Sequence, residues 1–330
     1  KFFYNLFVSL YLGVIGLASL WNPKAKLWIN GRKDQFKRLE EALQKSNQPL
    51  IWFHCASLGE FEQGRPLIEK IKKDLPDYKI FLTFFSPSGL EIRKNYKYAD
   101  HIFYLPLDTT KNAKQFLKIV QPQIVFFVKY EFWFFYLKKI SYRKIPLLLV
   151  SAIFRKEMSF FRWYGGISRK MAARFDHLFV QDPDSLALLE KIGLGPISSV
   201  SGDTRFDRVA EIASAPSTID AVEQFKGSNP LLVAGSTWPG DEEVIARAIE
   251  NPALADLKII LAPHEVSSSR LRELQVIFPQ SELLSTFQTT GNSNAKILLI
   301  DSIGLLSKLY RYATFAYVGG GFKQPGIHNT

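Results

Sequence analysis

The sequence predicts an α/β fold built on two doubly wound, parallel sheets. Short apolar runs of strand length alternate with segments of helical period from residue 50 to residue 202, and again after residue 229. Strands that are buried on both faces read as near-continuous apolar runs, and their alternation with helices predicts right-handed βαβ units. The chain of 330 residues is too long for one ordinary core and long enough for two domains.

The composition is that of a folded and basic protein. Hydrophobic residues make up 47% and charged residues 22% of the chain, which excludes a disordered polypeptide. A net charge of +11 and a pI near 9.5 favour an anionic partner, such as nucleic acid, phosphorylated lipid or nucleotide. The single cysteine, Cys55, lies in an apolar run, which predicts a buried, reduced thiol and a cytosolic compartment.

The N-terminal segment is uncharged from Phe2 to Pro23, and six basic residues follow between positions 24 and 38. Because a helix that spans a bilayer needs about 20 apolar residues, we predict that residues 1–23 form a membrane anchor helix. The positive charge behind it places the rest of the chain in the cytoplasm. Asn5, Ser9 and Ser19 weaken the apolar run, so a buried or interfacial helix is the alternative.

Seven apolar runs define the first domain, which we place at residues 24–202. A basic helix at 33–48 precedes them, and helical segments such as 61–75 and 183–193 lie between them. The predicted strands are 50–55, 79–85, 101–106, 123–128, 145–152, 177–181 and 197–202.

A polar stretch that contains proline and glycine, residues 203–228, breaks this rhythm, and we interpret it as the interdomain linker. The second domain, 229–330, has predicted strands at 229–236, 257–263, 296–301 and 315–321. No helix follows the last of these strands, which leaves one face of the second sheet uncovered. We therefore expect the natural protein to continue beyond Thr330, and this domain to be incomplete.

Glu60 follows the first predicted strand, in the stretch "WFHCASLGEFEQGRP" (52–66). In open α/β sheets, ligands bind outside the carboxyl ends of the strands. Ser57 and Glu60 have the Ser-x-x-Glu spacing of a helix capping box, so a structural role is one interpretation. The other is a general base, which the helix N-terminus would keep ionised.

A second carboxylate, Glu131, follows the fourth strand in "VKYEFW" (128–133), two residues after Lys129. A carboxylate among aromatic residues needs a partner, and both a structural ion pair and a substrate contact remain open. His54, within the first strand, is interpreted as a core or wall residue.

The second domain carries a pattern typical of a phosphate site. "GST" at 235–237 ends a strand before an acidic helical segment, and three glycines at 319–321 end another. Backbone N–H groups, two hydroxyls and a helix N-terminus suit a phosphate, and glycines allow close approach of the backbone. An ordinary helix cap and a plain turn are the alternatives. His264 and His328 lie close to these strand ends.

Other cofactor sites lack their sequence signatures. No Gly-x-Gly-x-x-Gly follows the first strand, which argues against a dinucleotide site, and no Walker A lysine follows the glycines. The five histidines show no metal-binding spacing, so we assign no metal.

Residues 129–175 interleave aromatic and basic side chains. This mixture suits single-stranded nucleic acid, or a membrane surface with anionic lipid, or a core helix with one solvated face. The predicted anchor favours the membrane, so we expect anionic lipid and not nucleic acid as a partner.

Five blocks in this order resemble the 3-deoxy-D-manno-octulosonic acid (Kdo) transferases of lipopolysaccharide synthesis: "HCASLGEFEQGRPLI", "VKYEFW", "GDTRFDRV", "GSTWPGDEE" and "YVGGGF…GIHN". The resemblance covers nearly the whole chain. It implies a GT-B glycosyltransferase, with two Rossmann-like domains facing a cleft, at the cytoplasmic face of the Gram-negative inner membrane. The implied donor is CMP-Kdo, the acceptor is the tetraacyl disaccharide lipid A precursor, and no cofactor is needed.

The resemblance also implies roles for individual residues. Glu60 matches the family's general base, and Glu131 matches its second important glutamate. Ser57, Gly59 and Lys129 would support the acceptor side. The implied donor contacts come from Gly235, Ser236 and Thr237 and from the 319–329 loop, with Gly319, Gly320, Gly321, His328 and Asn329. To these donor-binding residues we add His264, from its place at a strand end of the second domain.

Two departures from the family pattern affect the donor side. Trp238 stands where many members of the family have another residue, and the glutamate that follows the family's His-Asn pair would lie beyond Thr330. Two other functions remain open. One is a GT-B enzyme that uses a UDP-sugar, and the other is a non-catalytic binding protein at the membrane.

Overall fold

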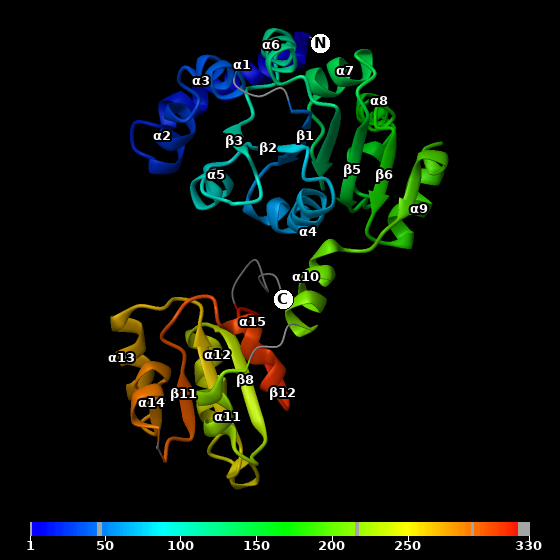
Figure 1. Cartoon of the computed structure of the whole chain (residues 1–330). Helices are drawn as coiled ribbons and strands as arrows, with labels where there is room; N and C mark the ends of the chain where they lie inside the picture. The colour runs from blue at the N-terminus through cyan, green and yellow to red at the C-terminus, as the bar shows by residue number, and fades with distance from the viewer. Residues whose placement is uncertain (1, 45–47, 215–217, 292–293, 323–330) are drawn as a thin grey trace. The chain divides into compact units, whose positions relative to one another are not determined.

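The computed structural model describes residues 2–44, 48–214, 218–291 and 294–322 (Figure 1). It divides the chain into two compact units, Lys1–Arg208 and Val209–Thr330. Each unit has a parallel sheet and hydrophobic clusters of its own. The predicted α/β class with parallel sheets is therefore confirmed.

The first unit contains seven strands in the order β3-β2-β1-β4-β5-β6-β7, all parallel. Their bounds are β1 (Leu50–Cys55), β2 (Lys79–Phe84), β3 (His101–Tyr104), β4 (Ile124–Val128), β5 (Leu147–Ala152), β6 (His177–Val180) and β7 (Ser198–Val200). All seven were predicted from apolar runs. Strand order reverses between β1 and β4, so this pair forms the topological switch point at which doubly wound sheets bind ligands.

Helices cover both faces of this sheet (Figure 1). They are α1 (Phe2–Ala18), α2 (Pro23–Asn30), α3 (Gln35–Leu43), α4 (Leu58–Asp74), α5 (Pro87–Arg93), α6 (Thr110–Val120), α7 (Phe134–Tyr142), α8 (Gly166–Ala172) and α9 (Pro183–Glu190), with short 3₁₀ turns η1 (Ser159–Phe161) and η2 (Gly195–Ile197). Successive residues of β1 point to opposite faces. Trp52 packs with α3, α6 and α7, whereas Phe53 packs with α4 and α5.

The N-terminal helix α1 packs on the first unit. The Tyr4 hydroxyl donates to the carboxylate of Asp108 at 2.5 Å, and the Tyr11 ring contacts Trp28 and Phe85. In the part of the chain that the structure describes, no helix has both the length and the apolarity to cross a membrane. The predicted anchor therefore stays a prediction.

The second unit has a five-stranded parallel sheet in the order β10-β11-β9-β8-β12. The strands are β8 (Leu231–Thr237), β9 (Lys258–Pro263), β10 (Ser281–Leu283), β11 (Ile297–Leu299) and β12 (Phe315–Val318). The helices are α11 (Asp220–Lys226), α12 (Pro239–Ala248), α13 (Ser268–Ile277), α14 (Leu284–Thr290) and α15 (Leu306–Leu309), with 3₁₀ turns η3 (Pro252–Leu254) and η4 (Tyr310–Tyr312). The sequence analysis missed β10. The chain crosses from one side of β8 to the other at β12, so these two strands form the switch point.

The predicted linker contains two helices. Helix α10 (Thr204–Ser214) runs through the boundary between the two units at Arg208 and Val209. Helix α11 belongs to the second unit, because Val222 and Phe225 are buried in its core. Among the described residues of 203–228, most are therefore helical and part of one unit or the other.

Candidate functional site

The first candidate site lies at the carboxyl edge of the first sheet, at its switch point. β1 and β4 are paired neighbours, with His54 opposite Phe127. Glu60 lies in the first turn of α4, just after β1, and Glu131 follows β4. The two predicted carboxylates therefore follow the two strands between which the order reverses, where a ligand is expected.

Glu60 forms the capping interaction that its spacing predicts, in a modified form. Ser57 is the N-cap of α4, with extended backbone, and its Oγ accepts from the Gly59 N–H at 3.3 Å. The Ser57 hydroxyl donates to Oε2 of Glu60, so the contact joins two side chains and not the glutamate and the N-cap N–H. Glu60 is half-buried. Capping and catalysis are compatible here, because one oxygen is held and the other, Oε1, has no hydrogen bond to the described residues.

Glu131 is held by two ring nitrogens. Its Oε2 accepts a hydrogen bond from Trp133 Nε1 at 2.6 Å and lies 3.2 Å from His54 Nε2. The side chain of His54 is 0% exposed and that of Glu131 12%. Glu131 therefore has structural partners in His54 and Trp133, and its contact with a substrate stays a prediction.

A chain of hydrogen bonds continues from this pair into the core. His54 Nδ1 lies 2.9 Å from the hydroxyl of Thr83, which accepts from Trp52 Nε1 at 2.8 Å. The Thr83 hydroxyl also donates to the carbonyl of Phe53 at 3.3 Å, and Trp133 Nε1 lies 3.0 Å from His54 Nε2. His54 was predicted to be a core or wall residue, and it is fully buried, but it also orients Glu131.

Lys129 adopts a left-handed backbone with φ 70°, and its Nζ lies 5.3 Å from the centre of the Tyr130 ring. Within the described residues it forms no ion pair with Glu131. Its side chain therefore contacts an aromatic ring next to the site.

Burial and nearby charged groups shift the pKa values of two residues at this edge. Burial raises the pKa of the Cys55 thiol, and the charges of Glu60, Glu131 and Glu62 raise it further. The thiol is fully buried, as predicted from its place in an apolar run. Burial also raises the pKa of Tyr130, while Arg155 opposes this rise through charge and a hydrogen bond and Glu60 adds to it.

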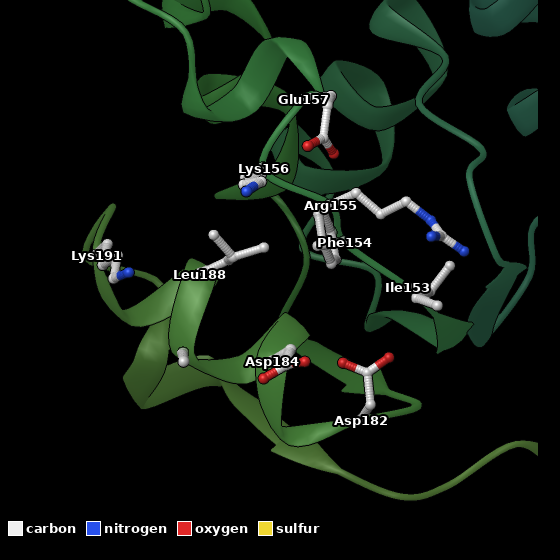
Figure 2. A pocket seen from close by; sticks show the side chains of 10 residues that line it. Ile153, Phe154, Arg155, Lys156, Glu157, Asp182, Asp184, Leu188 and Lys191 are labelled. Atoms are coloured by element: carbon white, nitrogen blue, oxygen red, sulfur yellow. The ribbon is translucent and has the colours of Figure 1, made fainter.

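A cavity of about 440 Å³ opens beside this edge, after β5 and β6 (Figure 2). Its size is in the range of small-molecule pockets. Three cations and three carboxylates contribute to a lining that consists of Ile153, Phe154, Arg155, Lys156, Glu157, Asp182, Asp184, Ala187, Leu188 and Lys191. The sequence analysis did not predict this cavity, because its residues come from two loops and one helix without a shared motif.

The second candidate site lies at the switch point of the second sheet. Gly235, Ser236 and Thr237 end β8, and the three glycines follow β12. The N–H of Gly319 donates to the carbonyl of Gly235 at 2.8 Å. A Cβ on Gly319 would lie 2.6 Å from the Ser236 carbonyl oxygen, so only glycine fits. The structure thus brings the two predicted loops into direct contact.

Two buried carboxylates organise these loops. Asp241 Oδ2 accepts from the backbone N–H groups of Trp238 and Gly320, each at 2.9 Å. The Thr237 hydroxyl donates to Glu242 at 3.0 Å, and Glu242 also pairs with Arg270. Burial raises the pKa of Glu242, and the contacts with Thr237 and Arg270 oppose the rise. Some of the groups predicted to bind phosphate are therefore used inside the protein.

An aromatic surface completes the described part of this site. The Trp238 indole stacks on the His264 ring, with centroids 4.5 Å apart and planes inclined by 23°. The backbone N–H of His264 also donates to the carbonyl of Thr237 at 3.0 Å. Gly321 lies at the end of the described chain, and His328 and Asn329 lie outside the described residues. Among the described residues, no group of three His, Cys, Asp or Glu could hold a metal ion.

Comparison with known proteins identifies relatives of the whole chain. Residues 31–208, more than half of the chain, match the family model of 3-deoxy-D-manno-octulosonic-acid transferase (kdotransferase). A 3-deoxy-D-manno-octulosonic acid transferase of Aquifex aeolicus is 27% identical over 290 residues, covering 86% of this chain and 73% of the relative. The Haemophilus influenzae enzyme of the same name is 24% identical over 345 residues, covering 100% and 78%.

Solved structures support the fold alone, because their sequences are distant. A UDP-GlcNAc 2-epimerase from Neisseria meningitidis bound to UDP-GlcNAc is 14% identical, with a TM-score of 0.51 over 81% of this chain and 76% of that one. The UDP-GlcNAc 2-epimerase from Methanocaldococcus jannaschii is 19% identical, with a TM-score of 0.51 over 81% and 77%. The family match and the curated relatives agree, and this chain belongs to the 3-deoxy-D-manno-octulosonic-acid (Kdo) transferase family.

Proposed function

We propose that this protein transfers Kdo from CMP-Kdo to the tetraacyl disaccharide lipid A precursor, with inversion and without a metal. Membership of the Kdo transferase family supports the transfer of Kdo. The observation that carries the mechanism is the position of Glu60, with one carboxylate oxygen held by Ser57 at the switch point of the first sheet. Glu60 is then the general base.

In the proposed reaction, Glu60 accepts the proton of the acceptor's primary hydroxyl as that oxygen attacks the anomeric carbon of Kdo. The new carbon–oxygen bond forms while the bond from the anomeric carbon to the phosphate oxygen breaks. CMP leaves from the opposite face, which inverts the configuration. General-base catalysis contributes about 10²–10⁴-fold to such a rate.

Glu131 serves the acceptor in this proposal. Two ring nitrogens fix its Oε2, so the carboxylate has one defined orientation. The neighbouring cavity after β5 and β6 supplies Arg155, Lys156 and Lys191, which suit an anionic group, and carboxylates, which suit sugar hydroxyls. In this proposal, Ser57, Gly59 and Lys129 shape the loops that carry Glu60 and Glu131.

The donor belongs to the second unit in this proposal. The Trp238–His264 stack offers a flat surface, and the loops of residues 235–237 and 319–321 offer backbone close to the ligand. Since Asp241 and Glu242 accept hydrogen bonds from the loops themselves, we assign them to the shape of these loops and not to phosphate contact. His328 and Asn329 complete the proposed donor site.

We also propose attachment to anionic lipid at the cytoplasmic face of the inner membrane through the N-terminal segment. The net charge of +11 supports an anionic surface. Trp163 and Tyr164 are exposed on the first unit and contact each other edge to face, next to Arg162. Exposed aromatics beside cations are typical of proteins at membrane surfaces.

A donor panel tests the proposed function. The protein is incubated with the lipid A precursor and either CMP-Kdo or a set of UDP-sugars, and the products are identified by mass spectrometry. We expect a product that is heavier by Kdo, and only with CMP-Kdo. Transfer from a UDP-sugar would favour a different glycosyltransferase. Absence of both transfer and nucleotide binding would favour a non-catalytic membrane protein.

A further inference from the structure

Helix α1 presents an apolar stripe to solvent. Leu10, Val14 and Leu17, at spacing i, i+4 and i+7, are 61%, 66% and 61% exposed. Beyond the end of the helix, Leu20 and Trp21 are 77% and 69% exposed. Residues at this spacing share one face of a helix. Clusters of exposed apolar side chains of this kind mark interaction surfaces.

The opposite stripe of α1 is attached to the first unit. Tyr4, Val8 and Tyr11 have the same i, i+4, i+7 spacing. Val8 is buried, and the Tyr11 ring lies against Trp28 and Phe85. The Tyr4 hydroxyl donates to the fully buried carboxylate of Asp108.

Asp108 is part of the framework of the unit, because its carboxylate also accepts the N–H groups of Phe135 and Tyr136 at the start of α7. Helix α1 is thus fixed along its side to a folded domain. The side chains of Leu10, Val14 and Leu17 are on the side that stays open to lipid.

The positive charge of the N-terminal segment favours an anionic partner for the stripe. Residues 2–33 contain four cations and neither aspartate nor glutamate. Lys24, Lys26 and Lys33 are exposed directly after the apolar segment. Apolar side chains with an exposed tryptophan and lysines beside them match the headgroup region of an anionic bilayer.

We infer that α1 lies in the plane of an anionic lipid surface, immersed by Leu10, Val14 and Leu17, with the first unit on top of it. This inference refines the membrane attachment proposed above and is independent of the transferred sugar. A loss of Kdo transfer would leave it standing.

The test measures the depth of two positions. Cys55 is fully buried, so Leu10→Cys and Leu17→Cys variants of the whole protein can be labelled selectively with a fluorophore. Vesicles of phosphatidylethanolamine and phosphatidylglycerol carry quenchers at a shallow or a deep position of the acyl chain. A helix in the membrane plane gives both labels the same quenching profile. A helix that crosses the membrane separates them by about 10 Å in depth, and such a difference would overturn the inference.

A charge substitution provides the second readout. Leu17→Glu should weaken binding to these vesicles by about tenfold or more, because burial of one apolar side chain is lost. Val276→Glu, at a position in the second unit that is 79% exposed, is the matched control and should bind like the parent. Equal binding of the Leu17→Glu and parent proteins would contradict the inference. So would a lipid-free dimer that Leu17→Glu dissociates, because a second copy would then cover the stripe.

Discussion

One oxygen of Glu131 is shared between two ring nitrogens from different parts of the chain. His54 comes from the end of β1, and Trp133 is the N-cap residue before α7. Thr83 fixes the other side of the His54 ring. A carboxylate that is held in this way loses little freedom when substrate binds. We therefore regard His54 as a positioning residue for Glu131.

His54→Gln should lower turnover about 10- to 100-fold, because loss of a hydrogen bond to a charged group costs about 1.5–3 kcal/mol. The affinity for CMP should not change, since His54 lies in the first unit. His177→Gln is the control. His177 is the first residue of β6, at the amino end of its strand and away from the site, and its ring is hydrogen-bonded to the Ser199 hydroxyl. Steady-state kinetics and calorimetry with CMP would measure both effects. Normal turnover in a folded His54→Gln protein would remove the positioning role.

Asp203 gives the first unit a pH-dependent stability. Burial raises its pKa, but hydrogen bonds from the Arg205 side chain and backbone outweigh burial, and the net pKa is lowered. Between the lowered and the ordinary carboxyl pKa, the unfolded chain binds more protons than the folded one, so stability rises with pH in this window. The contribution is therefore present above pH about 4 and is lost as pH falls through the folded pKa.

Asp203→Asn should flatten this acid dependence while lowering stability at neutral pH. Urea unfolding at a series of pH values between neutral and acid, for the parent and the variant, would measure it. If the two proteins lost stability in parallel on acidification, Asp203 would not be the group responsible.

At the scale of elements, the contact between the β8 and β12 loops depends on a glycine. A Cβ on Gly319 would lie 2.6 Å from the Ser236 oxygen and 2.7 Å from Thr237 Cα, both backbone atoms that cannot move alone. Gly319→Ala should therefore destabilise the second unit by about 1–3 kcal/mol and weaken CMP binding. The control is Gly240→Ala in α12, whose Cβ would lie 3.5 Å from a Phe322 side-chain atom, an ordinary contact. Thermal unfolding that ranks the two variants in the reverse order would contradict this account of the loop.

The sequence predicts elements better than it predicts their partners. The apolar strands were found because both faces of a parallel sheet are buried, as the fully buried β1 shows. β10 was missed because it has only three residues, Ser281–Leu283, and no apolar run. Helix α11 was included in the linker because the segment is short and lies in polar sequence, although Val222 and Phe225 are buried.

The pairings within the candidate sites could not be read from the sequence. His54 and Glu131 are 77 residues apart, and they meet only because β1 lies beside β4. Gly320 and Asp241 are 79 residues apart and meet through the pairing of β8 with β12. Position at a strand end predicted where Glu60 and the glycines would lie. It did not predict which groups would already be satisfied within the protein.

At the scale of the whole molecule, the two units have separate cores, and the proposed donor belongs to only one. Leu82 in β2 and Leu298 in β11 are both fully buried. Leu298→Ala and Leu82→Ala should each cost about 2–5 kcal/mol, in the second and the first unit respectively. CMP should raise the unfolding temperature of the transition that Leu298→Ala lowers. Scanning calorimetry with and without CMP would test this assignment, and protection of the transition that Leu82→Ala lowers would contradict it.

The central claim is that Glu60 is the base of a Kdo transfer. The most direct measurement is the rate of Kdo transfer by a Glu60→Gln variant, alongside its melting temperature and its affinity for CMP. Glutamine can still accept the hydrogen bond from Ser57, but it cannot take a proton from the acceptor. Ser57→Ala is the control, and it should lose about 1 kcal/mol of stability and keep most of its activity. We predict that Glu60→Gln lowers turnover by about 10²–10⁴-fold with nearly unchanged melting temperature and CMP affinity. Near-normal turnover, with a loss of stability instead, would show that Glu60 only caps α4 and would contradict the mechanism.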